Sequence, residues 1–179
     1  MRLALVLSLA DCVLLGCAHY ATWHDFTRSP NYWPPHSMVL EVSRSKTTQA
    51  ADAAGFVDAT VRALQDALRA RGVEGIVRDA GEHPPTARLE LEFVTWQPGR
   101  GEVTHLTESV RKEAFIAIVV KARSADDRVT LAGRVEGADL ESNGGTREAA
   151  EAAARSIARA LADAHYTPTV LKSLATSLP

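Results

Sequence analysis

The sequence has little cysteine, little net charge and no apolar run long enough to cross a bilayer. Its two cysteines, Cys12 and Cys17, leave no thiol beyond residue 17 for a disulfide, a redox centre or a metal site. The formal net charge of −2 provides no field that attracts nucleic acid, so we expect no nucleic-acid partner. The longest apolar run, residues 3–15, covers 13 residues, whereas a membrane-spanning helix needs roughly 20. Packing must therefore stabilise this fold without cross-links.

Sequence motifs that carry catalysis or metal binding are also absent. The chain contains no Gly-x-Ser-x-Gly stretch, and no two of its 6 histidines lie four residues apart on a predicted helix. Glu90 and Glu92 could present paired carboxylates on one strand face, but the same alternation keeps a half-exposed strand soluble. We therefore predict that the chain is not an enzyme, with no catalytic residues and no metal ligands.

The apolar run ends in Leu14-Leu15-Gly16-Cys17, which resembles a bacterial lipobox. The length of the run is typical of a signal peptide. The resemblance implies that a signal peptidase recognises Leu14, Leu15 and Gly16 and removes residues 1–16. It also implies that Cys17 carries covalent lipid, and we expect no other cofactor. The alternative is a buried N-terminal strand or helix with an ordinary cysteine.

The segment after the lipobox, residues 17–37, combines prolines with aromatic side chains. Pro30, Pro34 and Pro35, with no sustained hydrophobic period, predict an extended tether and not a helix or a central strand. Flexible linkers are usually poor in aromatic residues. The aromatic side chains therefore either lie on the surface of the domain or bind a partner or the membrane interface. The candidate partner-binding residues are Tyr20, Trp23, Phe26, Tyr32 and Trp33.

Residues 38–166 have the hydrophobic patterns of one α+β domain, followed by a C-terminal tail at 167–179. Alternation or continuous apolar character predicts strands at 38–42, 73–77, 88–93, 115–120 and 129–135. Apolar stripes predict two helices. The first stripe, which Gly72 ends, consists of Val57, Val61, Leu64 and Leu68, and the second of Ala150, Ala153, Ile157 and Leu161.

The predicted order of elements is β-α-β-β-β-β-α, which is typical of a two-layer sandwich. Both helices would cover one face of a largely antiparallel sheet and bury their stripes there. The other face, with Arg88, Glu90 and Glu92, would be solvated or available to a partner.

Three short motifs in this domain, together with the lipobox, resemble the YajG-like lipoproteins of Gram-negative bacteria. The motifs are Leu64-x-x-Ala67-Leu68-x-x-Arg71-Gly72, Ala114-x-Ile116-Ala117-Ile118 and Val135-Glu136-Gly137-Ala138. Their order and spacing agree with that family from about Phe56 to Leu174. The resemblance implies an outer-membrane lipoprotein without an established activity and with no catalytic residues to carry over.

Lipid on Cys17 would hold the protein on a membrane without a spanning helix, since acyl chains contribute about 0.8 kcal/mol per buried CH₂. Ala18, and not aspartate, follows the cysteine. By the family resemblance this favours the outer membrane over the inner one. We expect the domain to face the periplasm and an envelope protein to be its partner.

An anchor without catalytic chemistry predicts a non-enzymatic binding or assembly module of the cell envelope. Its partner would bind the open sheet face or the aromatic tether. The alternative is a carrier or chaperone for lipid or lipopolysaccharide, which rests on analogy at the level of the fold. An apolar cavity between the helices and the sheet would favour that alternative.

Overall fold

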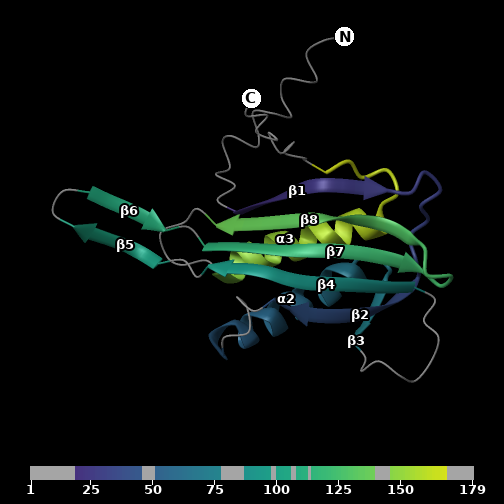
Figure 1. The fold of residues 1–179 in the computed structure, drawn as a ribbon, viewed down its shortest axis with the longest axis horizontal. Helices are drawn as coiled ribbons and strands as arrows, with labels where there is room; N and C mark the ends of the chain where they lie inside the picture. Colours follow the sequence, from purple (N-terminus) through teal and green to yellow (C-terminus); the bar gives the residue numbers. More distant parts are fainter. Residues whose placement is uncertain are drawn as a thin grey trace, which may run out of the picture.

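Two helices cover one face of a six-stranded sheet (Figure 1). The computed structural model describes residues 19–45, 51–77, 87–97, 100–105, 108–112, 114–139 and 146–168. In chain order the elements are β1 (His19–Arg28), β2 (Ser37–Arg44), α2 (Ala51–Arg69), β3 (Glu74–Val77), β4 (Ala87–Gln97), β5 (Arg100–His105), β6 (Glu108–Lys112), β7 (Ala114–Ser124), β8 (Val129–Asp139) and α3 (Thr146–Ala162).

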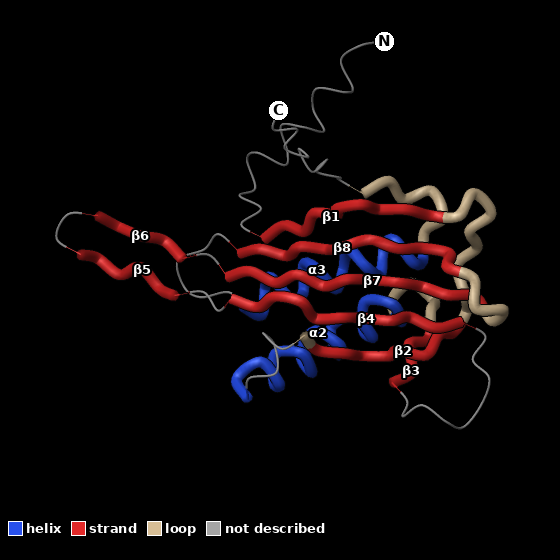
Figure 2. The backbone as a smooth tube through the Cα atoms, viewed as in Figure 1, coloured by secondary structure: helices blue, strands red, loops and turns tan. Residues whose placement is uncertain are grey.

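The strands of the main sheet lie in the order β1-β8-β7-β4-β2-β3. β2 runs parallel to both of its neighbours, β3 and β4, and the other neighbouring pairs are antiparallel. Figure 2 shows α2 and α3 together behind the sheet. The predicted α+β class, with two helices against a mostly antiparallel sheet, is therefore confirmed in outline.

A separate two-stranded hairpin, β5–β6, connects β4 to β7 and extends beyond the end of the main sheet (Figure 1). The sequence analysis predicts no strands in this segment. Apart from this hairpin, the seven predicted elements occur in the predicted order, and one further strand, β1, precedes them.

Strand β1 corrects the prediction that residues 17–37 form a tether. His19–Arg28 pairs antiparallel with β8, with an irregularity between His24 and Thr27. Asp25, inside that irregularity, has a φ of 52°. The prolines that predict a tether all follow this strand, in the connection to β2, so they interrupt no hydrogen-bonded ladder. The domain therefore includes β1 and does not begin at residue 38.

The apolar stripes of both helices are buried as predicted. Leu64 and Leu68 of α2 and Ile157 and Leu161 of α3 are among the largest fully buried side chains. Gly72 follows α2 with a φ of 76°, the left-handed conformation that ends many helices. The buried face of α3 is rich in alanine, and these small side chains let the helix approach the sheet closely. These buried alanines are Ala149, Ala150, Ala152, Ala153, Ala154, Ala158 and Ala160.

The predicted lipobox, Leu14 to Cys17, and the tail beyond residue 168 lie outside the described residues. Lipidation of Cys17 and the role of the tail therefore stay predictions. Among the helices that the structure describes, none is long and apolar enough to cross a bilayer.

Candidate functional site

The five aromatic side chains predicted to bind a partner divide into a buried group and an exposed group. Trp23 is 0% exposed and Tyr32 is also buried in the core. Phe26 is partly buried and packs edge-on against Trp23, with 4.9 Å between ring centroids. Tyr20 is 44% exposed and Trp33 82% exposed. Trp23, Phe26 and Tyr32 are therefore structural residues, and only Tyr20 and Trp33 are free to touch a partner.

Alternation along β1 explains why Trp23 is buried. Its side chain points to the helices, where the indole N–H donates to the hydroxyl of Ser156 on α3 at 2.9 Å. The next side chain, His24, lies on the open sheet face, and its Nε2 is 2.9 Å from a carboxylate oxygen of Glu136. A strand with one apolar and one polar face explains both positions.

Arg28, at the end of β1, is a residue that the sequence analysis missed. Its guanidinium donates to the main-chain carbonyls of Ala160, Ala164 and Tyr166 at 2.6, 2.8 and 3.0 Å. These carbonyls lie in and just after the last turn of α3, where a cation is favoured by the helix dipole. No sequence pattern predicts this contact, because Arg28 is a single charged residue and its partners are main-chain carbonyls far away in the sequence.

Tyr32, in the connection between β1 and β2, binds the C-terminal end of α3. Its hydroxyl donates to the carbonyl of Leu161 at 2.6 Å, and the Arg28 guanidinium lies 5.2 Å from its ring centroid. Burial raises the pKa of Tyr32 to about 12, while the charge of Arg28 opposes this rise. The loop that carries Trp33 is thereby fixed immediately before the exposed indole.

The raised pKa of Tyr32 predicts a loss of stability at high pH. Between pH 10 and pH 12 the phenol has lost its proton in the unfolded chain but keeps it in the folded protein. Rising pH therefore favours unfolding in this window, and we expect the free energy of unfolding to fall by about 2 kcal/mol. Urea unfolding at several pH values, compared with Tyr32→Phe, measures this effect. Equal pH slopes for the two proteins would contradict the prediction.

A pocket of about 340 Å³ lies beside Trp33, at the end of the sheet. One wall is the connection between β1 and β2, with Trp33, Pro34, Pro35 and His36, and the buried ring of Tyr32 lies behind it. The ends of four strands supply the remaining wall. These residues are Ser37, Met38, Ala87, Ala122, Ser124 and Thr130.

Among the lining residues that the structure describes, none is a lysine, arginine, aspartate or glutamate. Apart from Tyr32, the one titratable side chain in this described lining is His36, which is exposed. No residue of either helix is among the described residues that line the pocket. It is therefore not the cavity between helices and sheet that would favour a lipid carrier. Its mostly apolar, uncharged walls suit an apolar or aromatic side chain.

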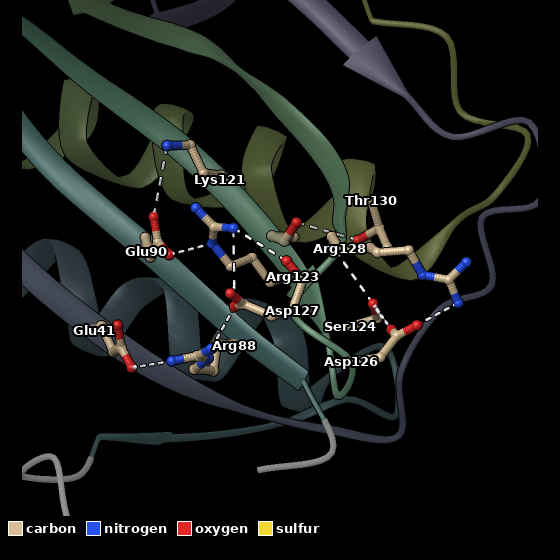
Figure 3. A network of polar contacts seen from close by, with 11 residues as sticks. Glu41, Arg88, Glu90, Lys121, Arg123, Ser124, Asp126, Asp127, Arg128 and Thr130 are labelled. Atoms are coloured by element: carbon tan, nitrogen blue, oxygen red, sulfur yellow. Dashed lines mark hydrogen bonds and ion pairs between the residues drawn. The ribbon is translucent and has the colours of Figure 1, made fainter. Parts of the chain in front are cut away.

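The open sheet face carries charges that pair with one another (Figure 3). Glu90 accepts a hydrogen bond from Arg123 at 2.5 Å and lies 3.8 Å from the ammonium of Lys121. Arg88 pairs with Asp127 in the turn after β7 and lies 4.0 Å from Glu41. Such half-exposed pairs add little stability each. Glu90 thus belongs to a network of ion pairs on this face. This supports the interpretation that the alternation of charged and apolar residues along β4 keeps the strand soluble.

Glu92 is exposed on the same face and shares a second pocket of about 220 Å³ with Glu41, Glu90 and Lys121. Among the described residues, no group of three or more histidine, cysteine or acidic side chains could hold a metal ion. The predictions that the chain binds no metal and is not an enzyme stay predictions.

Comparison with known proteins identifies the fold but no family. No protein-family model matches the chain, and no curated protein matches it. The resemblance to the YajG-like lipoproteins therefore stays a prediction. Among solved structures, the PelC dodecamer from Paraburkholderia phytofirmans has a TM-score of 0.54 at 14% identity and covers 83% of this chain and 99% of that one.

A single-substitution variant of the same PelC dodecamer gives a TM-score of 0.52 at 13% identity, with 76% of this chain and 97% of that one covered. A minor lipoprotein from Acinetobacter baumannii is 15% identical, with 71% and 92% coverage, at a TM-score of 0.38. At these identities, the two PelC structures show that this chain shares their fold, and they show nothing beyond the fold.

Proposed function

We propose that this chain is a lipid-anchored envelope protein that works as a non-enzymatic assembly module, and that a protein partner binds at the Trp33 end of the sheet. The observation that carries the proposal is Trp33 itself, which is 82% exposed beside a pocket whose described lining residues carry no charge. A large exposed aromatic side chain next to an apolar hollow is a common feature of protein-binding sites.

The length of β1 supports this orientation of the site. β1 begins at His19, two residues after Cys17, and ends at Arg28, four residues before Tyr32. Ten strand residues span about 30 Å at ~3.3 Å each. Lipid on Cys17 would therefore attach at one end of the sheet, and Trp33 would lie at the other end, away from the membrane that holds the anchor. We therefore expect a protein partner, and not that membrane, at Trp33.

The PelC structures that share this fold are dodecamers. A protein with this fold can thus form an assembly, and we propose the same kind of role for this chain. The role requires no catalytic group, in agreement with the paired charges on the open sheet face.

The second candidate function is transport of a lipid, and the apolar pocket is the observation that favours it. An acyl chain could occupy the uncharged space beside Trp33. The volume of about 340 Å³ is near the lower limit of typical ligand pockets, roughly 300 Å³, so one chain at most would fit.

A photo-crosslinking residue in place of His36, at the exposed edge of the pocket, tests the proposal in cells. We expect it to capture a protein in the membrane fraction. In a Cys17→Ser background we expect the chain to become soluble or to stay unprocessed, with capture much reduced. Immunoblots of the fractions and mass spectrometry of the N-terminus and of the captured species measure these results.

Cys12→Ser is the matched control, because Cys12 would leave with the signal peptide. This variant should be processed, anchored and crosslinked as the unchanged chain is. Normal processing and unchanged membrane fractionation of Cys17→Ser would refute the anchor. Capture of lipid without protein would refute the assembly module in favour of the carrier.

A further inference from the structure

Resting on the proposed function, we propose that the partner at the Trp33 end is a second copy of this chain, paired about a two-fold axis. In this arrangement the indole of each copy enters the pocket of the other. We name Trp33 and the adjoining pocket the Trp33 patch.

The Trp33 patch contains both a projecting group and a hollow that fits it. Trp33 is 82% exposed, and it has the highest exposed fraction among the large hydrophobic side chains that the structure describes. The pocket beside it measures about 340 Å³. An apolar cavity of about 150 Å³ already holds a benzene molecule. The pocket therefore has room for the larger indole ring.

A projecting group and its hollow on one patch favour a two-fold pair. In a two-fold interface the same patch is used by both subunits, so it must be complementary to itself. Within a single copy, Trp33 does not fill the pocket, because its side chain borders the pocket and stays exposed. Two copies fill both pockets at once.

Charges at the border of the patch do not oppose the approach of an identical surface. Ser124 lines the pocket, and the turn that follows it carries Asp126, Asp127 and Arg128. Arg128 pairs with Asp126, and Asp127 pairs with Arg88, as Figure 3 shows. The two positive and two negative charges balance within each copy. Among the described residues, this turn therefore adds no net charge between two copies that approach each other.

The area of the Trp33 patch predicts a weak pair in solution and a stable one on a membrane. A tryptophan buries about 150–250 Å². Two indoles and the pocket walls that cover them give roughly 600–1,000 Å², less than the roughly 1,200 Å² of a stable interface. Anchored copies would share one membrane with the same end pointing outward. This confinement raises their effective concentration and supports the weak contact.

The test uses the full lipidated chain, purified and reconstituted into phosphatidylethanolamine and phosphatidylglycerol vesicles that contain no other protein. With the photo-crosslinking residue at position 36, illumination should produce a band of twice the chain mass. Trp33→Ser should reduce this band by about tenfold or more, since a buried interface tryptophan contributes strongly to binding. Tyr20→Ser, which alters the exposed aromatic residue of β1, should leave the band unchanged.

Trp33 fluorescence is the second measurement. The emission of the unchanged chain should shift to shorter wavelength as the ratio of protein to lipid rises, and Trp33→Phe should abolish this shift. Thermal unfolding of the exposed-site variants checks that the fold is kept.

The outcomes separate this inference from the proposed function. A doubled band that Trp33→Ser does not weaken, or no doubled band in vesicles while cells yield a different protein, would overturn the two-fold pair and leave the assembly module standing. No captured protein in vesicles or in cells would overturn both.

Discussion

Trp23→Ala is expected to lower the free energy of unfolding by about 3–5 kcal/mol. The side chain is fully buried, packs edge-on against Phe26 and donates a hydrogen bond to Ser156. Removal of the indole leaves a cavity between β1 and α3, and the Ser156 hydroxyl keeps only its 3.5 Å contact with the hydroxyl of Tyr166. For a domain of this size the melting temperature should fall by roughly 10 °C. Urea unfolding followed by circular dichroism measures the loss.

Trp33→Ala is the matched control, because it removes the same side chain from an exposed position. Its free energy of unfolding should stay within about 0.5 kcal/mol of the unchanged chain. The comparison also tests the assignment of β1 to the fold. If Trp23→Ala were as mild as Trp33→Ala, residues 19–28 would behave as the tether that the prolines predict, and the pairing of β1 with β8 would be wrong.

Gly137→Ala is expected to cost about 3 kcal/mol, the upper part of the usual range for an overpacked core. A methyl group at this position would lie 2.3 Å from the carbonyl oxygen of Ala149 and 3.0 Å from the methyl group of Ala153. Both neighbours belong to α3, so the whole helix must move away from β8. Chemical denaturation measures the loss.

Gly55→Ala on α2 is the control for this substitution. Apart from its chain neighbours and the backbone of its own helix, no described atom lies within 4 Å of the added methyl group, and an exposed helical glycine costs about 0.5–1 kcal/mol relative to alanine. Gly55→Ala should therefore stabilise the protein slightly, while Gly137→Ala destabilises it. A neutral Gly137→Ala would mean that α3 does not pack as closely on the sheet as the structure has it.

The parts of the fold that sequence could predict depend on local periodicity. The stripes of α2 and α3, the alternation of β4 and β8 and the continuous apolar run of β7 each lie within one segment. The parallel pairing of β2 with β3 and β4 could not be predicted in this way, because it depends on contacts between segments. β1 was missed because the prolines after it outweighed its own alternation. The bulge at Asp25 also shifts that alternation midway.

The candidate site was predicted only in part. Trp33 was among the candidate residues, and the structure leaves it exposed. The pocket beside it draws on Met38, Ala87 and Ala122, from three different strands. None of these small or apolar residues differs in sequence from an ordinary core position, so no pattern could place them around Trp33. Arg28 was missed for the same reason, since its partners lie on the last helix.

The contacts between β1 and α3 set the order in which the chain can fold. The hydrogen bonds of Trp23, Arg28 and Tyr32 to α3 and the residues just after it join positions 129 to 138 apart in the sequence. The first strand therefore has no partner helix until almost the whole chain has been synthesised, and contacts over such separations form slowly. For the envelope location that we propose, this arrangement would keep the chain unfolded until it has crossed the membrane. The contact between β1 and α3 therefore completes the fold.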